Sequence, residues 1–245
     1  NVRSTVATYA DIHDELRRAY ARTPEAKEAG YKAGAFSYNT GALRCPTCDG
    51  TGAISLDVQF LPDVEIVCPA CRGSRYAEAA SHIHRESADG SLLTLPQLMD
   101  MSVDEALDAT LGLKKIQARL QTLHDLGLGY LTLGEPTPAL SGGEAQRLKL
   151  ASEMGRVQDD AVFVFDEPTI GLHPLDVEVL LGVFDGLVSK GATVVVIEHD
   201  LDLIRNADYV IDMGPGGGDA GGRIVCAGTP AAVAAFPKSV TGRYL

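Results

Sequence analysis

The chain contains 245 residues, of which 45% are hydrophobic and 22% charged, and its formal net charge is −12. This composition is typical of a folded globular protein and excludes an intrinsically disordered chain. No apolar run approaches the roughly 18 residues that a membrane span needs, and the polar first residues do not resemble a secretory signal. We therefore expect a cytoplasmic protein with no membrane partner. Because residue 1 is not Met, we also expect a piece of a longer protein.

The negative charge is unevenly distributed along the chain. Residues 1–85 contain 10 Lys and Arg and 10 Asp and Glu, whereas the remaining residues contain 11 and 23. DNA phosphates attract Lys and Arg and repel carboxylates. Any contact with DNA is therefore expected in the first third, although charge alone does not predict DNA binding.

Helical periodicity governs the start of the chain. Residues 8–29 are predicted to be helical, with Thr23-Pro24-Glu25 as a helix-start signal. Four apolar side chains are expected to share one face of this helix: Tyr9, Ile12, Leu16 and Tyr20. Residues 41–76 differ, with paired cysteines, glycines and a short alternating stretch at 54–58.

The chain is predicted to become helical again from residue 97. Ser102 and Glu105 form a capping-box pattern. Leu113, Ile116, Leu120 and Leu123 make an apolar stripe that ends at Gly127, as expected for a helix with one buried face.

Beyond Gly134 the pattern is that of an α/β fold. Helices are predicted at about 142–156 and 176–189, and continuous apolar strands at 161–165, 193–197 and 209–212. This alternation predicts a parallel sheet covered by helices on both faces. A glycine-rich turn at 214–222 leads into a strand at 223–226, which is predicted to form an edge hairpin.

Four of the five cysteines form two pairs, Cys45 with Cys48 and Cys68 with Cys71, separated by 19 residues. This spacing is typical of a tetrahedral four-thiolate zinc site. Both pairs share the frame C-P-x-C-x-G, in which the glycine would permit a positive φ. Disulfides and a thiol-redox site are the alternatives, and disulfides are disfavoured because cytosolic thiols stay reduced. The spacing leaves open whether the zinc is only structural or also presents a DNA-contacting hairpin.

Three arginines flank the cysteine pairs and are candidates for phosphate contacts: Arg44, Arg72 and Arg75. Cys226 stands alone in an apolar strand, which favours a core position over a ligand role. His82 and His84 alternate with Ile83 as in a strand, so surface or half-buried roles are favoured over metal binding.

The string Leu140-Ser-Gly-Gly-Glu-Ala-Gln-Arg147 is the most specific in the chain. Ser141, Gly142 and Gly143 at a helix start would present backbone N–H groups at the positive end of a helix dipole, which suits a phosphate. The alternative is an ordinary Ser cap. The attached Glu144-Ala-Gln-Arg147 and the Asp-Glu pair about 20 residues later argue against it.

The Asp-Glu pair follows the strand at 161–165, and carboxyl ends of such strands carry the ligand site in open α/β folds. Asp166 would hold Mg²⁺, and Glu167 would orient or deprotonate the attacking water. Asp176 lies in a D-loop-like position. His199, directly after the strand at 193–197 and Glu198, fits a residue that senses the γ-phosphate.

A phosphate-binding loop of the form G-x-x-x-x-G-K-[ST] is missing. Of the seven lysines only Lys238 precedes Ser or Thr, and Pro237 before it excludes the motif. The chain alone is therefore not expected to bind ATP tightly or to hydrolyse it.

These motifs together resemble the C-terminal nucleotide-binding half of the UvrA family. The resemblance rests on LSGGEAQR, FDEPTIGLHPLD, VVVIEHD, the run DMGPGGGDAGG, the FLPDV between the cysteine pairs, and RSTVATYADI near the start. It covers nearly all 245 residues in the family's order. It implies an ABC-ATPase-type α/β core with a parallel sheet and a helical signature subdomain that carries the zinc module.

The resemblance implies four segments. Residues 1–40 would lead into the signature subdomain, 41–80 would form the zinc module, 81–157 the helical subdomain ending in the signature helix, and 158–245 part of the ATPase core. The signature would be Ser141 to Glu144, and the zinc ligands the four paired cysteines.

The resemblance also implies the recognition of DNA damage in nucleotide excision repair and a link to the SOS response. The implied partners are DNA, a second UvrA copy, UvrB through regions outside this chain, and the missing ABC half that supplies the phosphate loop. The implied cofactors are zinc and, with that half, Mg-ATP.

Three other functions remain as alternatives. Ile170 and Pro174-Leu175 lean toward shorter UvrA-like paralogues, some of which are associated with resistance to DNA-binding antibiotics. A DnaJ-like zinc chaperone would explain the cysteine repeats but not the signature. A transporter ATPase subunit would explain the signature but not the zinc module.

Overall fold

The computed structural model describes residues 3–56, 64–154, 160–172, 174–216, 218 and 221–245. The chain forms two compact units, Asn1–Arg156 and Val157–Leu245. Each unit is described by itself below. The finer division of the first unit into three segments remains a prediction.

The first unit opens with three short helices rather than one long helix. They are α1 (Val6–Tyr9), α2 (Ile12–Tyr20) and α3 (Pro24–Glu28). The predicted helix over 8–29 is therefore wrong in its continuity, because Asp11 adopts the left-handed conformation (φ 55°) and breaks it. The expected face holds within α2, where Ile12, Leu16 and Tyr20 are buried, but Tyr9 is exposed.

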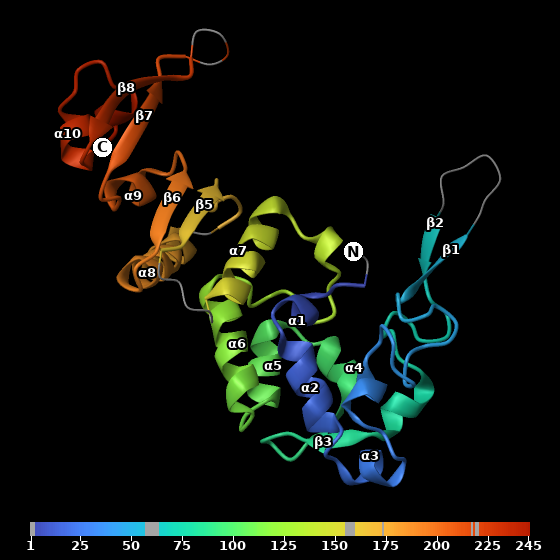
Figure 1. Cartoon of the computed structure of the whole chain (residues 1–245). Coiled ribbons are helices and arrows are strands. Elements are labelled where there is room, and N and C mark those ends of the chain that lie inside the picture. Colours follow the sequence, from blue (N-terminus) through green and yellow to red (C-terminus); the bar gives the residue numbers. More distant parts are fainter. Residues whose placement is uncertain (1–2, 57–63, 155–159, 173, 217, 219–220) are drawn as a thin grey trace. The chain divides into compact units, whose positions relative to one another are not determined.

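The cysteine-rich segment follows the 3-10 helix η1 (Ala33–Phe36) and contains one antiparallel hairpin. Its strands β1 (Ala53–Leu56) and β2 (Val64–Val67) project from the cysteine knuckles (Figure 1). Beyond the knuckles lie η2 (Glu78–His82), the antiparallel pair β3 (His84–Glu86) and β4 (Leu92–Thr94), and α4 (Leu95–Met99). The alternating stretch predicted at 54–58 is confirmed as a strand up to Leu56, and residues 57–58 lie outside the described residues.

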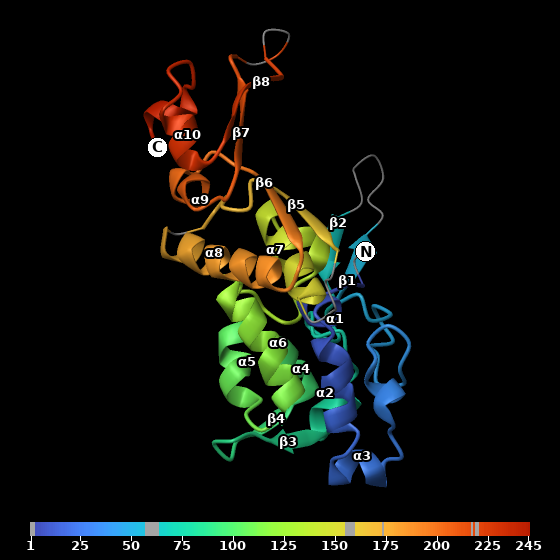
Figure 2. The same ribbon diagram turned by 60° about the vertical axis from the view of Figure 1, so that its left-hand side comes forward.

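Three further helices complete the first unit: α5 (Val103–Ala109), α6 (Lys114–Asp125) and α7 (Gly142–Glu153), with η3 (Thr137–Ala139) before the last. The capping box of Ser102 and Glu105 is present at the start of α5. The predicted stripe on α6 is buried at Ile116, Leu120 and Leu123, whereas Leu113 precedes the helix as its N-cap and is half-buried. Helix α6 packs against α5 and α2 (Figure 2). These contacts form the core that carries the signature helix α7.

The second unit begins with a parallel strand pair. Strands β5 (Val162–Asp166) and β6 (Thr193–Ile197) are joined by helix α8 (Pro174–Ser189), and Phe165 packs against Phe184 of that helix at a ring distance of 5.0 Å. The opposite face of the pair, with Val162, Val164, Val195 and Ile197, is exposed among the described residues. Within the described residues of this unit, α8 packs on one face of the strand pair, and the expected second helical layer is not found there.

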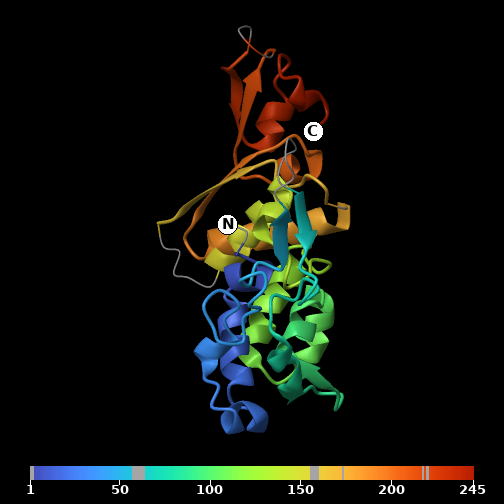
Figure 3. The ribbon, with the colours of Figure 1, turned by 90° about the vertical axis from the view of Figure 1, so that its right-hand side faces the viewer.

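The rest of the second unit is a separate ribbon. After the short helix α9 (Leu201–Arg205), strand β7 (Val210–Gly214) pairs antiparallel with β8 (Arg223–Gly228), which confirms the predicted hairpin. The strand at 209–212 was also expected in the parallel sheet, and this is wrong for the described residues, because β7 pairs with β8 and not with β5 or β6. Helix α10 (Pro230–Ala234) packs against this ribbon and the turn η5 (Thr241–Arg243) follows (Figure 3). Among the described residues, no helix is both long and apolar enough to cross a membrane.

Candidate metal centre and nucleotide-binding residues

The two cysteine knuckles have the same backbone form. In each, the second cysteine is followed by two residues of positive φ: Asp49 and Gly50 in one, Arg72 and Gly73 in the other. The predicted role of the two glycines is therefore confirmed. At Gly50 the requirement is also steric, because an added Cβ would lie 1.7 Å from the carbonyl oxygen of Tyr38.

The repeated turns bring four thiols together. All four Sγ atoms lie within 4.8 Å of one another, with Cys45 to Cys68 at 4.0 Å and Cys48 to Cys71 at 3.6 Å. A tetrahedral zinc site with Zn–S bonds of about 2.3 Å has S···S edges of about 3.8 Å, and a disulfide requires about 2.05 Å. The geometry fits a four-thiolate metal site, and all five cysteines are free thiols.

Protonation of this cluster depends on its surroundings. The pKa of the Cys71 thiol is raised to about 12, mainly by burial and also by contacts with Cys48 and Cys68, while backbone hydrogen bonds at Arg75 and Gly73 oppose this rise. Thiolates bind metal ions and a divalent cation reverses such shifts. The donor set therefore suits a soft or borderline cation such as Zn²⁺.

Backbone and ring contacts fasten the knuckles to the helices of the first unit. The N–H of Cys45 donates to the carbonyl of Arg75 at 3.0 Å. The hydroxyl of Tyr76 donates to the carbonyl of Phe36 at 3.0 Å and lies 2.8 Å from Nε2 of His13 on α2. The metal centre is thereby built onto the helical core.

The three arginines predicted to contact phosphate differ in their surroundings. Arg75 is only 5% exposed and its guanidinium lies over the Tyr38 ring at 5.3 Å, which does not suit a phosphate contact. Arg44 is half-buried and pairs with Asp49 at 2.8 Å. Arg72 is exposed. Of the three, Arg72 alone is both exposed and outside the ion pairs found among the described residues.

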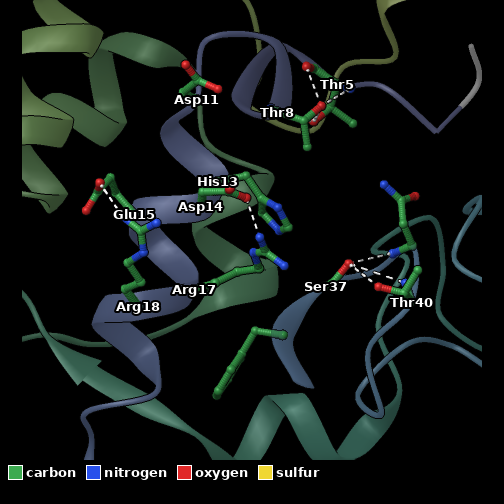
Figure 4. A network of polar contacts seen from close by, with 12 residues as sticks. Thr5, Thr8, Asp11, His13, Asp14, Glu15, Arg17, Arg18, Ser37 and Thr40 are labelled. Carbon is green, nitrogen blue, oxygen red and sulfur yellow. Dashed lines mark hydrogen bonds and ion pairs between the residues drawn. The ribbon is translucent and has the colours of Figure 1, made fainter. Parts of the chain in front are cut away.

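A basic groove of about 430 Å³, lined by α2, α3 and η1 and the turns between them, was not predicted from the sequence. Its charged lining consists of cations only, namely Arg18, Arg22, Lys27 and Lys32. Arg18 pairs with Glu15 at 2.8 Å (Figure 4), whereas the other three form no ion pair with a described residue. Tyr31 adds an aromatic ring to the lining. In the sequence these cations are separate charges between residues 18 and 32, and only the folding of this segment brings them to one surface.

Ser141 caps the signature helix α7 through a complete capping box. The N–H of Glu144 donates to the Ser141 hydroxyl at 3.3 Å, and the N–H of Ser141 donates to the Glu144 carboxylate at 2.6 Å. The Tyr130 hydroxyl donates to the same carboxylate. This hydrogen bond is the main reason that the pKa of Glu144 lies below its ordinary value. Ser141 and Gly142 are exposed and Gly143 is half-buried, so this helix start is accessible.

Asp166 and Glu167 lie at the end of β5, beside the end of β6. Register pairs Asp166 with Ile197, and the N–H of Glu167 donates to the Ile197 carbonyl at 2.8 Å. His199 Nδ1 is 3.7 Å from Glu167 Oε1, and the two side chains are 77% and 45% exposed. The predicted Walker B and switch residues are therefore neighbours on one sheet edge.

Glu198 was not predicted from the sequence as a site residue. Its carboxylate accepts hydrogen bonds from Thr169, His199 and Asp200. Burial tends to raise the pKa of Glu198, but hydrogen bonds from Thr169 and from the backbone outweigh this and lower it.

The remaining predicted residues have simpler outcomes. Asp176 lies in the first turn of α8, but its side chain is outside the described part of the chain. Cys226 on β8 is half-buried rather than in the core. His82 is exposed and His84 is half-buried, as predicted.

Comparison with known proteins gives one consistent result. No family model matches the chain. The chain is 47% identical over 244 residues to UvrABC system protein A of Mycobacterium tuberculosis and of Aquifex aeolicus, which covers 99% of the chain and 25% and 26% of these relatives. The crystal structure of UvrA2 from Deinococcus radiodurans matches 100% of the chain and 30% of its own with a TM-score of 0.90 and 43% identity. The chain thus spans about a quarter of the curated relatives it matches. With this similarity along its whole length, the chain belongs to the UvrA family.

Proposed function

We propose that the chain is the zinc-module, signature and Walker B part of a UvrA-type, DNA-binding ABC ATPase that recognises damage in nucleotide excision repair. The observation that carries this proposal is the pairing of Glu167 and His199 at one sheet edge, 3.7 Å apart, in a chain similar to UvrA throughout. The zinc-chaperone and transporter alternatives do not account for a match that runs through both cysteine module and ATPase region.

In this function Asp166 would hold Mg²⁺ and Glu167 would accept a proton from, or orient, the attacking water. When bound with ATP, Mg²⁺ neutralises charge that develops on the phosphates. His199 would contact the γ-phosphate, and Asp176 would lie in the D-loop. Ser141, Gly142, Gly143 and Glu144 would contact a nucleotide held by a phosphate loop outside this chain.

Turnover in the full-length protein tests the role of Glu167. Changing Glu167 to Gln keeps its size but removes the base, so we expect ATP hydrolysis at this site to fall by at least roughly 100-fold with nucleotide binding retained. Glu178→Gln, an exposed residue on α8, removes the same charge and is the matched control. Equal turnover in Glu167→Gln and wild type would contradict the proposed chemistry.

The metal at the cysteine cluster is proposed to be zinc. Four thiolates with S···S distances of 3.6 and 4.0 Å support a closed site with no open position, which favours a structural role. Elemental analysis of the purified protein should give one zinc per chain, and a metal content near zero would reject the proposal.

DNA is the proposed binding partner, and the basic groove supports DNA binding better than the arginines at the knuckles do. We expect Arg22→Ala/Lys27→Ala/Lys32→Ala in the full-length protein to weaken DNA binding. The slope of log K against log salt concentration should become shallower by about 0.9 for each lost phosphate contact, for up to three contacts. A matched control removes three exposed cations elsewhere: Lys149, Lys190 and Arg223. Equal salt slopes for both triple variants would exclude the groove as a phosphate-binding surface.

The proposals on assembly and location rest on family membership alone. The proposed partners are a second UvrA copy, the missing ABC half and, through regions outside this chain, UvrB, and the proposed location is the cytoplasm. A UvrA-like paralogue remains the second candidate, because the matched solved structure is a UvrA2.

A further inference from the structure

Glu198 connects the two segments that carry the candidate catalytic side chains. Its side chain is 2% exposed and directly follows β6. One oxygen, Oε1, accepts hydrogen bonds from the N–H of Thr169 at 3.0 Å and from its hydroxyl. The other, Oε2, accepts from the N–H groups of His199 at 2.7 Å and Asp200 at 3.1 Å. A single buried carboxylate thus holds the turn after β5 to the turn after β6.

Both turns need such support. Glu167, two residues before Thr169, has a φ of 47°, a left-handed conformation that costs a non-glycine residue about 1–3 kcal/mol and persists only where neighbours hold it. The His199 side chain is 77% exposed, and its Nδ1 lies 3.7 Å from the Glu167 carboxylate and 3.8 Å from that of Glu198. Its ring has no hydrogen bond among the described residues, so the backbone is its main anchor. The Glu198 carboxylate bonds that backbone directly.

We propose that Glu198 is a positioning residue that fixes the separation of Glu167 and His199 for ATP hydrolysis. The inference rests on the proposed function, since it assigns Glu198 a role in the same reaction. Glu198 itself faces inward and touches neither nucleotide nor water in this role.

An ionised carboxylate is required by the donor pattern. Oε1 accepts from two donors on the turn after β5, and Oε2 accepts from two donors on the turn after β6. A glutamine would present an NH₂ group on one side. Toward His199 and Asp200 this group would oppose two N–H donors, whereas toward Thr169 it could donate to the hydroxyl but would leave the Thr169 N–H unpaired. Either orientation of the amide therefore leaves at least one buried N–H without its acceptor.

The test uses the full-length protein with three variants: Glu198→Gln, Thr169→Val, which removes one hydroxyl bond only, and Glu178→Gln as the exposed control. Three quantities are measured: kcat for ATP hydrolysis, the Kd of a fluorescent ATP analogue, and amide hydrogen exchange of peptides covering 167–170 and 198–200. We expect Glu198→Gln to lower kcat roughly 10- to 100-fold with Kd changed less than about threefold, because misplaced catalytic groups affect the transition state more than binding. Exchange should accelerate in both peptides.

Thr169→Val should shift kcat and exchange in the same direction by a smaller factor, which keeps the test valid if Glu198→Gln fails to fold. Unchanged kcat, or a lower kcat with both peptides still protected, would overturn the positioning role. If the wild-type protein shows no ATP hydrolysis, the proposed function fails instead. Exchange alone then decides whether Glu198 holds the two turns.

Discussion

Replacing His13 by Gln should make the first unit less sensitive to mild acid. His13 lies on α2, is 3% exposed, and has its Nε2 atom 2.8 Å from the Tyr76 hydroxyl oxygen. Because the Tyr76 hydroxyl donates to the Phe36 carbonyl, the histidine nitrogen must act as the donor, which a neutral Nε2–H tautomer satisfies. The pKa of His13 is lowered to about 3, chiefly by burial and also by the positive charges of Arg17 and Arg75, while Asp14 opposes this shift.

The sign and size of the effect follow from proton linkage. In the unfolded chain the pKa of His13 returns to 6.5, so below that pH the unfolded state binds a proton that the folded state does not. The free energy of unfolding is therefore highest above pH 6.5 and falls as the pH drops toward 3. Between pH 7 and pH 5 the loss from this one residue is about 2 kcal/mol. A glutamine cannot titrate, and its amide can still donate to Tyr76.

The assay is urea unfolding at pH 7 and pH 5 in the presence of zinc, followed by tyrosine fluorescence. Tyr209 and Tyr244 are the only tyrosines beyond residue 156, so the signal comes mainly from the first unit. We expect the His13→Gln protein to lose about 2 kcal/mol less than wild type between the two pH values. His82→Gln, at an exposed histidine with no ion pair among the described residues, should follow wild type. Parallel pH dependences for wild type and His13→Gln would refute a neutral buried His13.

Three further perturbations test the packing of the first unit. Cys48→Ala should release the metal, which elemental analysis would detect as zinc loss, and should disorder residues 45–71. The protease sensitivity of the second unit should stay unchanged. Gly50→Ala should destabilise more than Gly73→Ala in urea unfolding, since the added Cβ meets a carbonyl oxygen at 1.7 Å in the first and a side-chain carbon at 3.7 Å in the second; equal losses would contradict the close approach. Leu120→Ala should cost about 2–5 kcal/mol by urea unfolding, against less than about 0.5 kcal/mol for the exposed Lys115→Ala.

Local patterns predicted those features whose causes are local. The cysteine cluster follows from two C-x-x-C turns, each of which converges its thiols by its own backbone, so spacing alone was enough to predict it. The same holds for the capping boxes at Ser102 and Ser141, where the partner lies three residues away. Strands β5 and β6 were predicted by continuous apolar runs, and their parallel pairing by the helix between them.

Features that depend on distant contacts were missed. Nothing beside Arg75 in the sequence shows that its side chain turns inward onto Tyr38, 37 positions earlier. The basic groove requires α2 and η1 to lie together. Asp11 breaks the predicted helix although the apolar spacing continues across it, because periodicity reports which residues are buried and not whether the backbone between them is continuous.

Two carboxylates fix the backbone around the proposed nucleotide contacts in the same way. Glu144 accepts the N–H of Ser141 at one helix start, and Glu198 accepts the N–H groups of His199 and Asp200 at the sheet edge. Protein carboxylates thus bond these backbone groups, and the Ser141 hydroxyl, Glu167 and His199 remain accessible to a ligand. A fixed backbone with accessible side chains is the arrangement that electrostatic preorganisation requires, because the reacting groups then need no reorganisation when the phosphate arrives. Each unit therefore holds the backbone around its own proposed nucleotide contacts in position.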